Sequence, residues 1–444
     1  MPAQPSTRIA LRGDLLDLVA DPGFDPGTAG MPPAGVRWRP DHWLLVEDGR
    51  IVGTRPGDDP PDDGWERHDH AGKLITPGLT DTHVHSPQID VIGSYGTQLL
   101  DWLETYTFPA ERRHAEPAYA VPAAAHFLDA LLAHGTTSAV VFPTVHPGSV
   151  DALFEAGRAR GMRLVAGKIL MDRHAPDDLR DDVEQAERDC VDLIERWHGQ
   201  GRLSYAVTPR FAPTSSDAQL AMAGRLCAAF DGLYMQTHVA ENRDEVRWVA
   251  ELFPDARSYL DVYARHGLLG ARSVLAHGIW LDDDDRRALA QAGAQVAHCP
   301  SSNLFLGSGL FDWRQAADAG VAVSLASDVG GGTSLSMLRA MADAYKVQAM
   351  AGTRLPAWQA LWACTHGAAR ALGLSHEFGH LSDGTLADLA VWDWATGPVA
   401  RRRDALADDL HQRLFAFMTL GDERNLAATW VAGRPAYVRR GETA

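Results

Sequence analysis

The sequence predicts an α/β protein, a (β/α)8 TIM-like barrel joined to a small β unit that is built from both chain termini. Two observations predict the barrel: eight short apolar runs lie in the middle of the 444-residue chain, and helical patterns separate most of them. A third observation, strand-like segments at both ends, predicts the β unit. We expect three parts, residues 1–76, 77–380 and 381–444.

The two ends of the chain read as short strands. Residues 7–13 and 42–56 have strand patterns, and a Gly/Pro-rich segment between them, 21–35, predicts an irregular insertion. The tail repeats the strand pattern over 386–394 and 425–441. Strands at both ends around a long middle indicate one unit that both termini complete.

The middle alternates apolar and helical segments. Near-continuous apolar runs are typical of a parallel sheet that is buried on both faces. The predicted strands cover 74–85, 136–145, 163–170, 203–211, 233–241, 273–278, 294–300 and 321–328. Helical patterns cover, among others, 151–161, 182–197 and 282–293.

Composition limits the partners. The 45% hydrophobic and 22% charged fractions are ordinary for a globular protein, and no run approaches about 20 apolar residues, so we expect no membrane span. A net charge of −17 argues against a nucleic-acid partner and leaves a small molecule. Four scattered cysteines without a CxxC motif, and no signal-peptide pattern at the N-terminus, predict a cytoplasmic protein.

Reactive side chains stand at the ends of the predicted strands. The carboxyl ends of all strands of a (β/α)8 barrel meet on one face, where active sites lie. The residues in this position are His83, His85, Arg210, His238, Glu241, His277, His298 and Asp328. Residues more than 200 positions apart can therefore surround one point.

Two HxH pairs need different interpretations. Side chains at i and i+2 of a strand share a face, so His83 and His85 can bind one cation together. His68 and His70 repeat the spacing in a polar stretch before the barrel, and we assign them no role.

Each candidate ligand alone also has a structural interpretation. His238 or His277 could be a hydrogen-bonded core histidine, and Asp328 could cap a helix. An HxH pair with histidines on the fifth and sixth strands and an aspartate on the eighth predicts a metal site. We interpret His134, His298 and His366 as structural.

These residues resemble the amidohydrolase superfamily and, within it, the guanine deaminase family of metal-dependent aminohydrolases. The resemblance runs from about residue 72 to the C-terminus, and it implies that the terminal β unit is a β-sandwich. The segments that carry it include PGLTDTHVHSPQ, LLDWLETYTFPAE, VTPRFAPTSS, QTHVAENRDEV, VLAHGIWL, AHCPSSNLFLGSG and ASDVGGGTSLSML.

The resemblance implies one zinc ion per subunit. Its ligands would be His83, His85, His238 and Asp328. Imidazole and carboxylate ligands suit Zn²⁺, and they also suit Fe²⁺ or Mn²⁺. A bound zinc lowers the pKa of water from 15.7 to about 7 and so supplies hydroxide at neutral pH.

The implied reaction converts guanine and water to xanthine and ammonia by attack of metal-activated hydroxide at C2. Glu241 would carry protons to the ring nitrogen and the leaving ammonia, help that is typically worth about 10²- to 10⁴-fold. Its alternative role is an acid at a helix N-terminus. His277 and Asp328 would orient the water.

The resemblance also implies the residues that contact the base. Gln88 and Arg210 would read guanine, because arginine supplies fixed donors for a carbonyl oxygen and glutamine can both donate and accept. Phe211 and Trp102 could stack on the purine, although Trp102 fits core packing equally well. The substrate would also face His85, His238, Glu241 and Asp328.

Other functions stay open at this point. A related aminohydrolase could act on 8-oxoguanine, ammeline or another amino-substituted heterocycle, and a metal-free member of the superfamily could be a binding scaffold. Cytidine-type zinc deaminases need a PCxxC motif, which the chain lacks. The family implies a homodimer that acts on a purine base. Ala240 replaces a common serine, and we expect no chemical effect.

Overall fold

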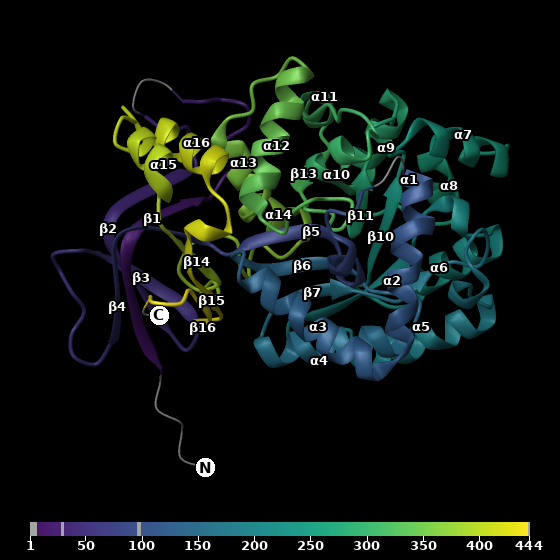
Figure 1. The fold of residues 1–444 in the computed structure, drawn as a ribbon, viewed down its shortest axis with the longest axis horizontal. Coiled ribbons are helices and arrows are strands. Elements are labelled where there is room, and N and C mark those ends of the chain that lie inside the picture. The colour runs from purple at the N-terminus through teal and green to yellow at the C-terminus, as the bar shows by residue number, and fades with distance from the viewer. Residues whose placement is uncertain (1–6, 28–30, 96–98, 443–444) are drawn as a thin grey trace, which may run out of the picture.

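The computed structural model describes residues 7–27, 31–95 and 99–442. It has two parts, a barrel of parallel strands wrapped by helices and a separate sheet beside it (Figure 1). The predicted fold class is confirmed.

The barrel contains all eight predicted strands. Neighbours pair in parallel in the order β13-β12-β11-β10-β9-β7-β6-β5, and β8 (Ile169–Leu170) adds a short extra pairing to β9. The strands are β5 (Leu79–His85), β6 (Thr136–Phe142), β7 (Arg163–Ala166), β9 (Leu203–Pro209), β10 (Tyr234–Val239), β11 (Ser273–His277), β12 (Gln295–His298) and β13 (Ala322–Leu325).

The ring closes where its first and last strands end. The N–H of Asp328 donates to the carbonyl of His83, and the N–H of His85 donates to the carbonyl of Val329, both at 2.9 Å. These bonds fix the residues that follow β13 against the carboxyl end of β5. Backbone hydrogen bonds therefore hold two predicted metal ligands on β5, His83 and His85, next to a third, Asp328, which follows β13.

Helices cover the outside of the barrel, and the three predicted helical segments appear as α4, α5 and α9. Side-chain caps explain two of their starts, because Asp182 accepts from Gln185 N–H and Asp282 forms a capping box with Asp285. The longer helices are α3 (Pro117–Leu132), α4 (Pro147–Arg160), α5 (Val183–Trp197), α6 (Asp217–Ala229), α7 (Arg243–Leu252), α9 (Asp283–Ala292) and α12 (Met337–Met350). The shorter ones are α8 (Tyr259–Arg265), α10 (Pro300–Phe305), α11 (Trp313–Asp318), α13 (Ala357–Ala363) and α14 (His366–Ala371).

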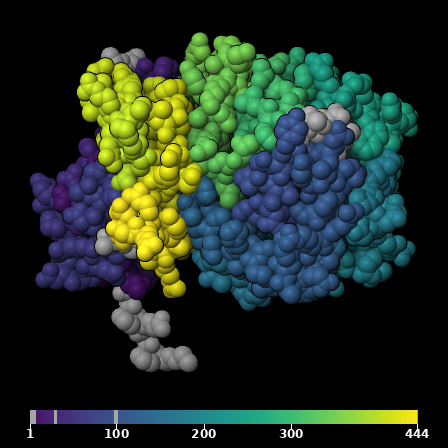
Figure 2. Space-filling model, viewed as in Figure 1, coloured from purple at the N-terminus to yellow at the C-terminus, as the bar shows by residue number. Residues whose placement is uncertain are grey.

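The second part is one seven-stranded sheet with strands from both ends of the chain, in the order β16-β15-β14-β4-β1-β2-β3. Its inner face has a core of its own, formed by side chains such as Leu11, Leu44, Ile75 and Trp430. The strands are β1 (Arg8–Leu18), β2 (Val36–Glu47), β3 (Arg50–Pro56), β4 (Glu66–Pro77), β14 (Leu389–Trp392), β15 (Leu426–Val431) and β16 (Arg434–Val438). Figure 2 shows the two ends of the chain, purple and yellow, together beside the barrel.

Two details differ from the predicted strands. The first eight residues of β4, 66–73, were not predicted, because they are polar and only His70 among them is buried. The predicted strand 74–85 is divided at Gly78, where the chain passes from the terminal sheet to the barrel. A Cβ atom at Gly78 would lie 2.3 Å from the Thr137 hydroxyl, so a glycine is required at this passage.

The insertion at 21–35 contacts the barrel as well as the terminal sheet. The Phe24 ring packs edge-on against Trp313 on α11, and Trp358 Nε1 on α13 donates to the carbonyl of Pro26. Between β14 and β15, two further helices, α15 (Gly397–Asp404) and α16 (Leu410–Leu420), complete the terminal part, and α16 packs against α12. In the described part of the chain, no helix has the length and apolarity of a membrane span.

Candidate active site

Four predicted ligands converge at the carboxyl end of the barrel. His85 Nε2 lies 3.2 Å from His83 Nε2 and 3.2 Å from His238 Nε2. Asp328 Oδ1 lies 3.2 Å from His83 Nε2 and 3.4 Å from His85 Nε2. The ligand atoms of all four lie within 4.8 Å of one another, so the group can hold one ion.

The protonation of these side chains favours a cation between them. His238 Nδ1 lies 2.7 Å from the carbonyl of Arg210 and must donate to it, so its Nε2 carries a lone pair. Burial lowers the pKa of His85 to about 3 and that of His238 well below its usual value, so both rings are neutral. Burial alone would raise the pKa of Asp328, but His83 and the neighbouring histidines hold it well below its usual range.

The spacing fits a metal of the size of zinc. A cation between His85 Nε2 and His238 Nε2, which lie 3.2 Å apart, would accept a lone pair from each ring. Ligands at 2.0–2.1 Å from a tetrahedral zinc are separated by about 3.3–3.4 Å. The four separations of 3.2–3.4 Å between these histidine and carboxylate atoms match that spacing.

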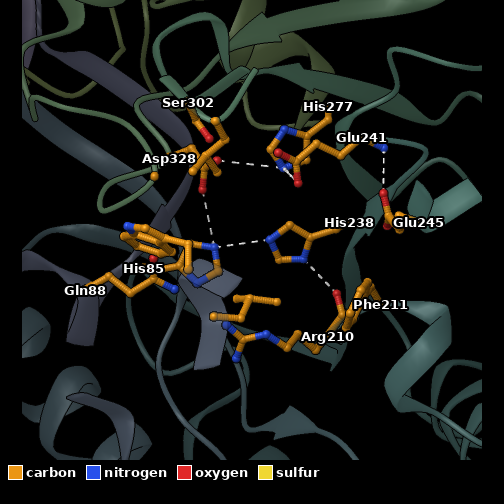
Figure 3. A pocket seen from close by; sticks show the side chains of 14 residues that line it. His85, Gln88, Arg210, Phe211, His238, Glu241, Glu245, His277, Ser302 and Asp328 are labelled. Carbon is orange, nitrogen blue, oxygen red and sulfur yellow. Dashed lines mark hydrogen bonds and ion pairs between the residues drawn. The ribbon is translucent and has the colours of Figure 1, made fainter. Parts of the chain in front are cut away.

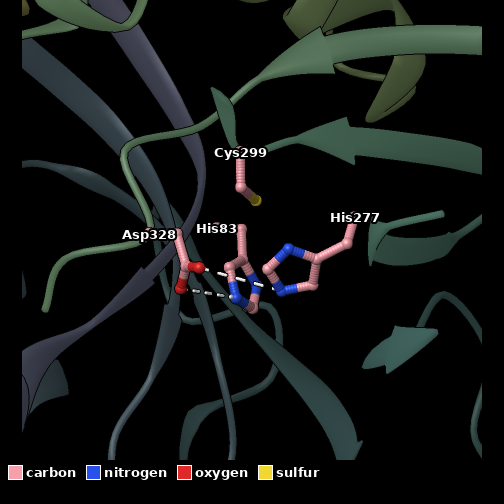
Figure 4. Close-up of side chains that lie close together, drawn as sticks. All are labelled: His83, His277, Cys299 and Asp328. Carbon is pink, nitrogen blue, oxygen red and sulfur yellow. Dashed lines mark ion pairs between the residues drawn. The ribbon is translucent and has the colours of Figure 1, made fainter. Parts of the chain in front are cut away.

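A second set of side chains overlaps the first. It consists of His83, His277, Cys299 and Asp328, and it shares two residues with the first set (Figure 4). Cys299 Sγ donates to the carbonyl of Ala297, and burial raises the pKa of this thiol well above its usual value. A protonated, hydrogen-bonded thiol is a poor ligand, so the first set suits a metal better.

Glu241, a buried carboxyl group in the loop after β10, lies close to the four candidate ligands. Burial, together with the Asp328 charge, raises the pKa of Glu241 to about 8, so this carboxyl is mostly protonated at neutral pH. Ser308 donates to Glu241 Oε1 at 2.7 Å, and Glu241 Oε2 lies 3.5 Å from His277 Nε2. The His277 ring is fixed by Asn303, whose Oδ1 lies 2.8 Å from His277 Nδ1.

The loop that carries Glu241 is fixed by the helix after it. Glu245 Oε2 accepts the backbone N–H groups of Glu241 and Asn242, and Tyr259 donates to Glu245 Oε1. Ala240 has φ of 47°, a conformation that costs energy for a non-glycine residue. Asp328 (φ 48°) and His277 (φ 73°) also have positive φ, so three residues at the site are in this conformation.

The opposite wall of the pocket is built from the segment after β5. Gln88 lies on the 3-10 helix η1 (Ser86–Val91), Trp102 ends α1 (Leu99–Trp102), and Glu111 lies on α2 (Phe108–Arg112) beyond a π-helical turn, η2 (Leu103–Thr107). Gln88 Oε1 accepts from the N–H of Gly330 at 3.1 Å. This bond fixes the orientation of the Gln88 amide, whose NH₂ group keeps two donors and whose oxygen keeps a second lone pair.

Arg210 follows β9 and reaches the same wall. Its Nη1 donates to both carboxyl oxygens of Glu111, at 2.8 and 2.9 Å. Phe211 and Trp102 are 5% and 2% exposed and both line the pocket, where their rings can contact a flat ligand.

All but one of the predicted site residues line one pocket, which holds about 440 Å³ of empty space (Figure 3). The exception is His83, which lies directly behind His85. The predicted residues in the lining are His85, Gln88, Trp102, Arg210, Phe211, His238, Glu241, His277 and Asp328.

The histidines interpreted as structural lie outside this lining. His134 Nδ1 contacts the carbonyl of Ala130, and His366 Nδ1 contacts that of Leu18. His298 is fully buried against Phe311.

The sequence interpretation missed four residues that support the site. These are Glu111, Glu245, Asn303 and Ser308. Glu111 and Glu245 fall inside the segments that carry the family resemblance, but only burial shows that they are unusual carboxylates.

Comparison with known proteins agrees with this geometry. The Amidohydrolase family model matches residues 74–436. Guanine deaminase of Escherichia coli is 44% identical over 97% of this chain and 98% of its own length. Guanine deaminase from Bradyrhizobium japonicum superposes with a TM-score of 0.92 at 34% identity, covering 98% of this chain and all of the other.

A second solved structure contains a ligand. Guanine deaminase from C. acetobutylicum, solved with guanine in its active site, has a TM-score of 0.86 at 26% identity and covers 97% of this chain and 100% of its own. The chain therefore belongs to the amidohydrolase family and, within it, to the guanine deaminases.

Proposed function

We propose that this protein is a guanine deaminase that hydrolyses guanine to xanthine and ammonia. The observation that carries the proposal is the composition of one pocket. A metal-ligand group and a protonated Glu241 form one wall, and the hydrogen-bond donors of Gln88 and Arg210 form the other. A flat base with an amine at one edge and carbonyl acceptors at the other matches these two walls.

We propose His83, His85, His238 and Asp328 as ligands of one Zn²⁺ per subunit; the same ligand types suit Fe²⁺ and Mn²⁺. When bound, such a metal acidifies water to a pKa of about 7 and so provides a nucleophile at neutral pH. The neutral His85 and His238 and the ionised Asp328 are ready to bind it without losing protons.

Glu241 carries the protons. Its Oε1 is held by Ser308, while Oε2 faces the metal side and His277. From that oxygen a proton can pass to the ring nitrogen beside C2 as the C2–O bond forms. The resulting carboxylate can then take the proton that remains on the attacking oxygen and pass it to the departing amine, so that the C2–N bond breaks and a carbonyl is left at C2. His277 Nε2 and Asp328 Oδ2, 3.7 Å apart, orient the attacking water.

The substrate is held by its other edge. Arg210 and Gln88 donate to acceptor atoms such as guanine O6, whereas adenine presents an amine there. Phe211 and Trp102 contact the ring faces. His85, His238, Glu241 and Asp328 contact the reacting end.

The test measures ammonia and xanthine formed from guanine, with 8-oxoguanine, ammeline, cytosine and adenine in parallel. We expect rapid turnover of guanine, and a loss of about 10²- to 10⁴-fold in kcat for Glu241→Gln with its metal retained. Turnover of a different ring would overturn the substrate. No turnover of any of them by the metal-loaded protein would overturn the deaminase.

We also propose a cytoplasmic homodimer, as the family resemblance implies. Light scattering of the purified protein measures the oligomeric state, and cell fractionation measures the location. A monomer at micromolar concentration would contradict the homodimer.

A further inference from the structure

Glu111 is a buried carboxylate that the proposed chemistry does not use. It is fully buried on α2, and its charged partner is Arg210, which donates from Nη1 to both of its oxygens. Placing an ion pair in the interior costs much of what the attraction between its charges gains. Stability alone is therefore a weak reason for this pair.

Glu111 also contacts Gln88, the second residue proposed to bind the base. The Gln88 side chain forms a hydrogen bond with the Glu111 carboxyl, and Gln88 Oε1 is already occupied by the N–H of Gly330. Only the NH₂ group of Gln88 can donate to Glu111. One carboxylate thus orients both Gln88 and Arg210, and both side chains, which line the pocket, keep N–H donors that Glu111 does not use.

We propose that Glu111 is a positioning residue that sets selectivity for a neutral base, an inference that rests on the proposed guanine deaminase function. It acts in two ways. It fixes Gln88 and Arg210 as a pair of donors, and it cancels the positive charge of Arg210 at the wall of a closed pocket.

The charge has a consequence for the product. Hydrolysis replaces the amine of guanine with a carbonyl, and the xanthine that forms loses a ring proton more readily than guanine does. An arginine without a counter-ion in a pocket with little water binds anions preferentially. Burial raises the pKa of Glu111, and the two Arg210 contacts at 2.8 and 2.9 Å oppose that rise by favouring the carboxylate. With this carboxylate beside Arg210, the anionic form of the product gains no such advantage.

The pair has a matched counterpart at the other end of the barrel. Glu377 binds Arg202 (Nε to Oε1, 3.0 Å) and Arg163, both near the amino ends of strands and far from the pocket. Glu377→Gln removes a carboxylate from a comparable arginine pair, and it is the control for a general loss of stability.

The experiment compares Glu111→Gln, Glu111→Asp and Glu377→Gln with the unchanged protein. The readouts are guanine kcat and KM, metal content, and inhibition constants for xanthine and for hypoxanthine, a neutral analogue that keeps O6 and N7. For Glu111→Gln we expect a loss of about 10- to 100-fold in kcat/KM with full metal content. We also expect xanthine to bind about tenfold more tightly relative to hypoxanthine.

Glu111→Asp separates the two effects, because it keeps the charge but withdraws it from Gln88 and Arg210. Its guanine KM should rise while the ratio of the two inhibition constants stays as in the unchanged protein. If Glu111→Gln leaves that ratio unaltered, or if Glu377→Gln alters it equally, the proposal is wrong. If Glu111→Gln does not fold, a Glu111→Asp variant that loses kcat and not KM overturns it.

The outcome is distinguishable from failure of the proposed function. Binding of xanthine and hypoxanthine can be measured by calorimetry without turnover. If the unchanged protein fails to deaminate guanine, the guanine deaminase proposal fails by itself, and the ratio of the two affinities still tests the role of Glu111.

Discussion

Two HxH pairs, on neighbouring strands of the chain, have the same spacing and different surroundings. His68 and His70 lie on β4 of the terminal sheet, and His83 and His85 lie on β5 of the barrel. In each pair the two side chains share a face of an extended strand. The local backbone therefore does not distinguish them.

The two HxH pairs differ in the residues that surround them. His68 has Glu66 at 3.3 Å and the edge of Trp430, and among the described residues no candidate metal group includes His68 or His70. The barrel pair meets a third histidine and an aspartate from two other strand ends. A metal site thus depends on convergence at the end of a closed barrel, where distant ligands meet, and not on the HxH spacing.

Removing a histidine of the barrel pair should have the largest effect. His85→Ala deletes a ligand that contacts both His83 and His238, so we expect it to lose metal. Its guanine deamination should fall by more than the 10- to 100-fold that is typical of residues around the ligands. Metal analysis and kcat measure both. Chelation followed by added zinc should restore the unchanged protein only, and a variant with full metal and activity would refute the ligand assignment.

Removing Arg210, a residue proposed to bind the base, should separate catalysis from metal binding. Arg210→Ala takes away donors to the base but leaves the backbone carbonyl that fixes His238. We expect kcat/KM to fall by about 10²- to 10⁴-fold with one metal per subunit retained. Arg210→Lys keeps a charge without the planar fork and should lie between the two. Loss of metal in Arg210→Ala would contradict the division of the pocket into two walls.

The same contrast explains what sequence could predict. Each apolar run predicts one barrel strand, and the carboxyl ends of these strands meet on one face. His83, His238, His277 and Asp328 could therefore be predicted from their positions at the ends of these runs. The wall with Gln88 and Trp102 is built from short 3-10, α and π turns without a period, and only the family resemblance pointed to it.

The supporting residues could not be predicted for a physical reason. Glu111 is polar in sequence and fully buried in the fold, and its role depends on a partner 99 residues away. The unpredicted first part of β4, residues 66–73, has a similar cause, because it is polar and the apolar residues of this strand begin at Leu74. Hydrophobic periodicity identifies buried faces, and it does not identify buried charges.

Removing a side chain that orients a residue of the site should have a moderate effect on kcat. Asn303→Ala removes the acceptor of His277 Nδ1, so the ring can rotate away from Glu241 and Asp328. We expect a loss of about 10- to 100-fold in kcat, with little change in metal content. Asn303→Asp keeps an acceptor oxygen in place and should recover part of the rate. Equal rates for Asn303→Ala and the unchanged protein would mean that His277 needs no orientation.

Removing the other HxH pair should have the smallest effect. In a His68→Ala/His70→Ala variant we expect guanine kcat/KM within about twofold and one metal per subunit, because neither ring approaches the pocket. Stability should fall slightly, since the edge contact of His68 with Trp430, 4.8 Å between ring centroids, is worth about 0.5–1.5 kcal/mol. A thermal melt measures that loss. If this variant instead loses its metal, HxH spacing alone recruits the ion, and convergence at the barrel end does not explain the site.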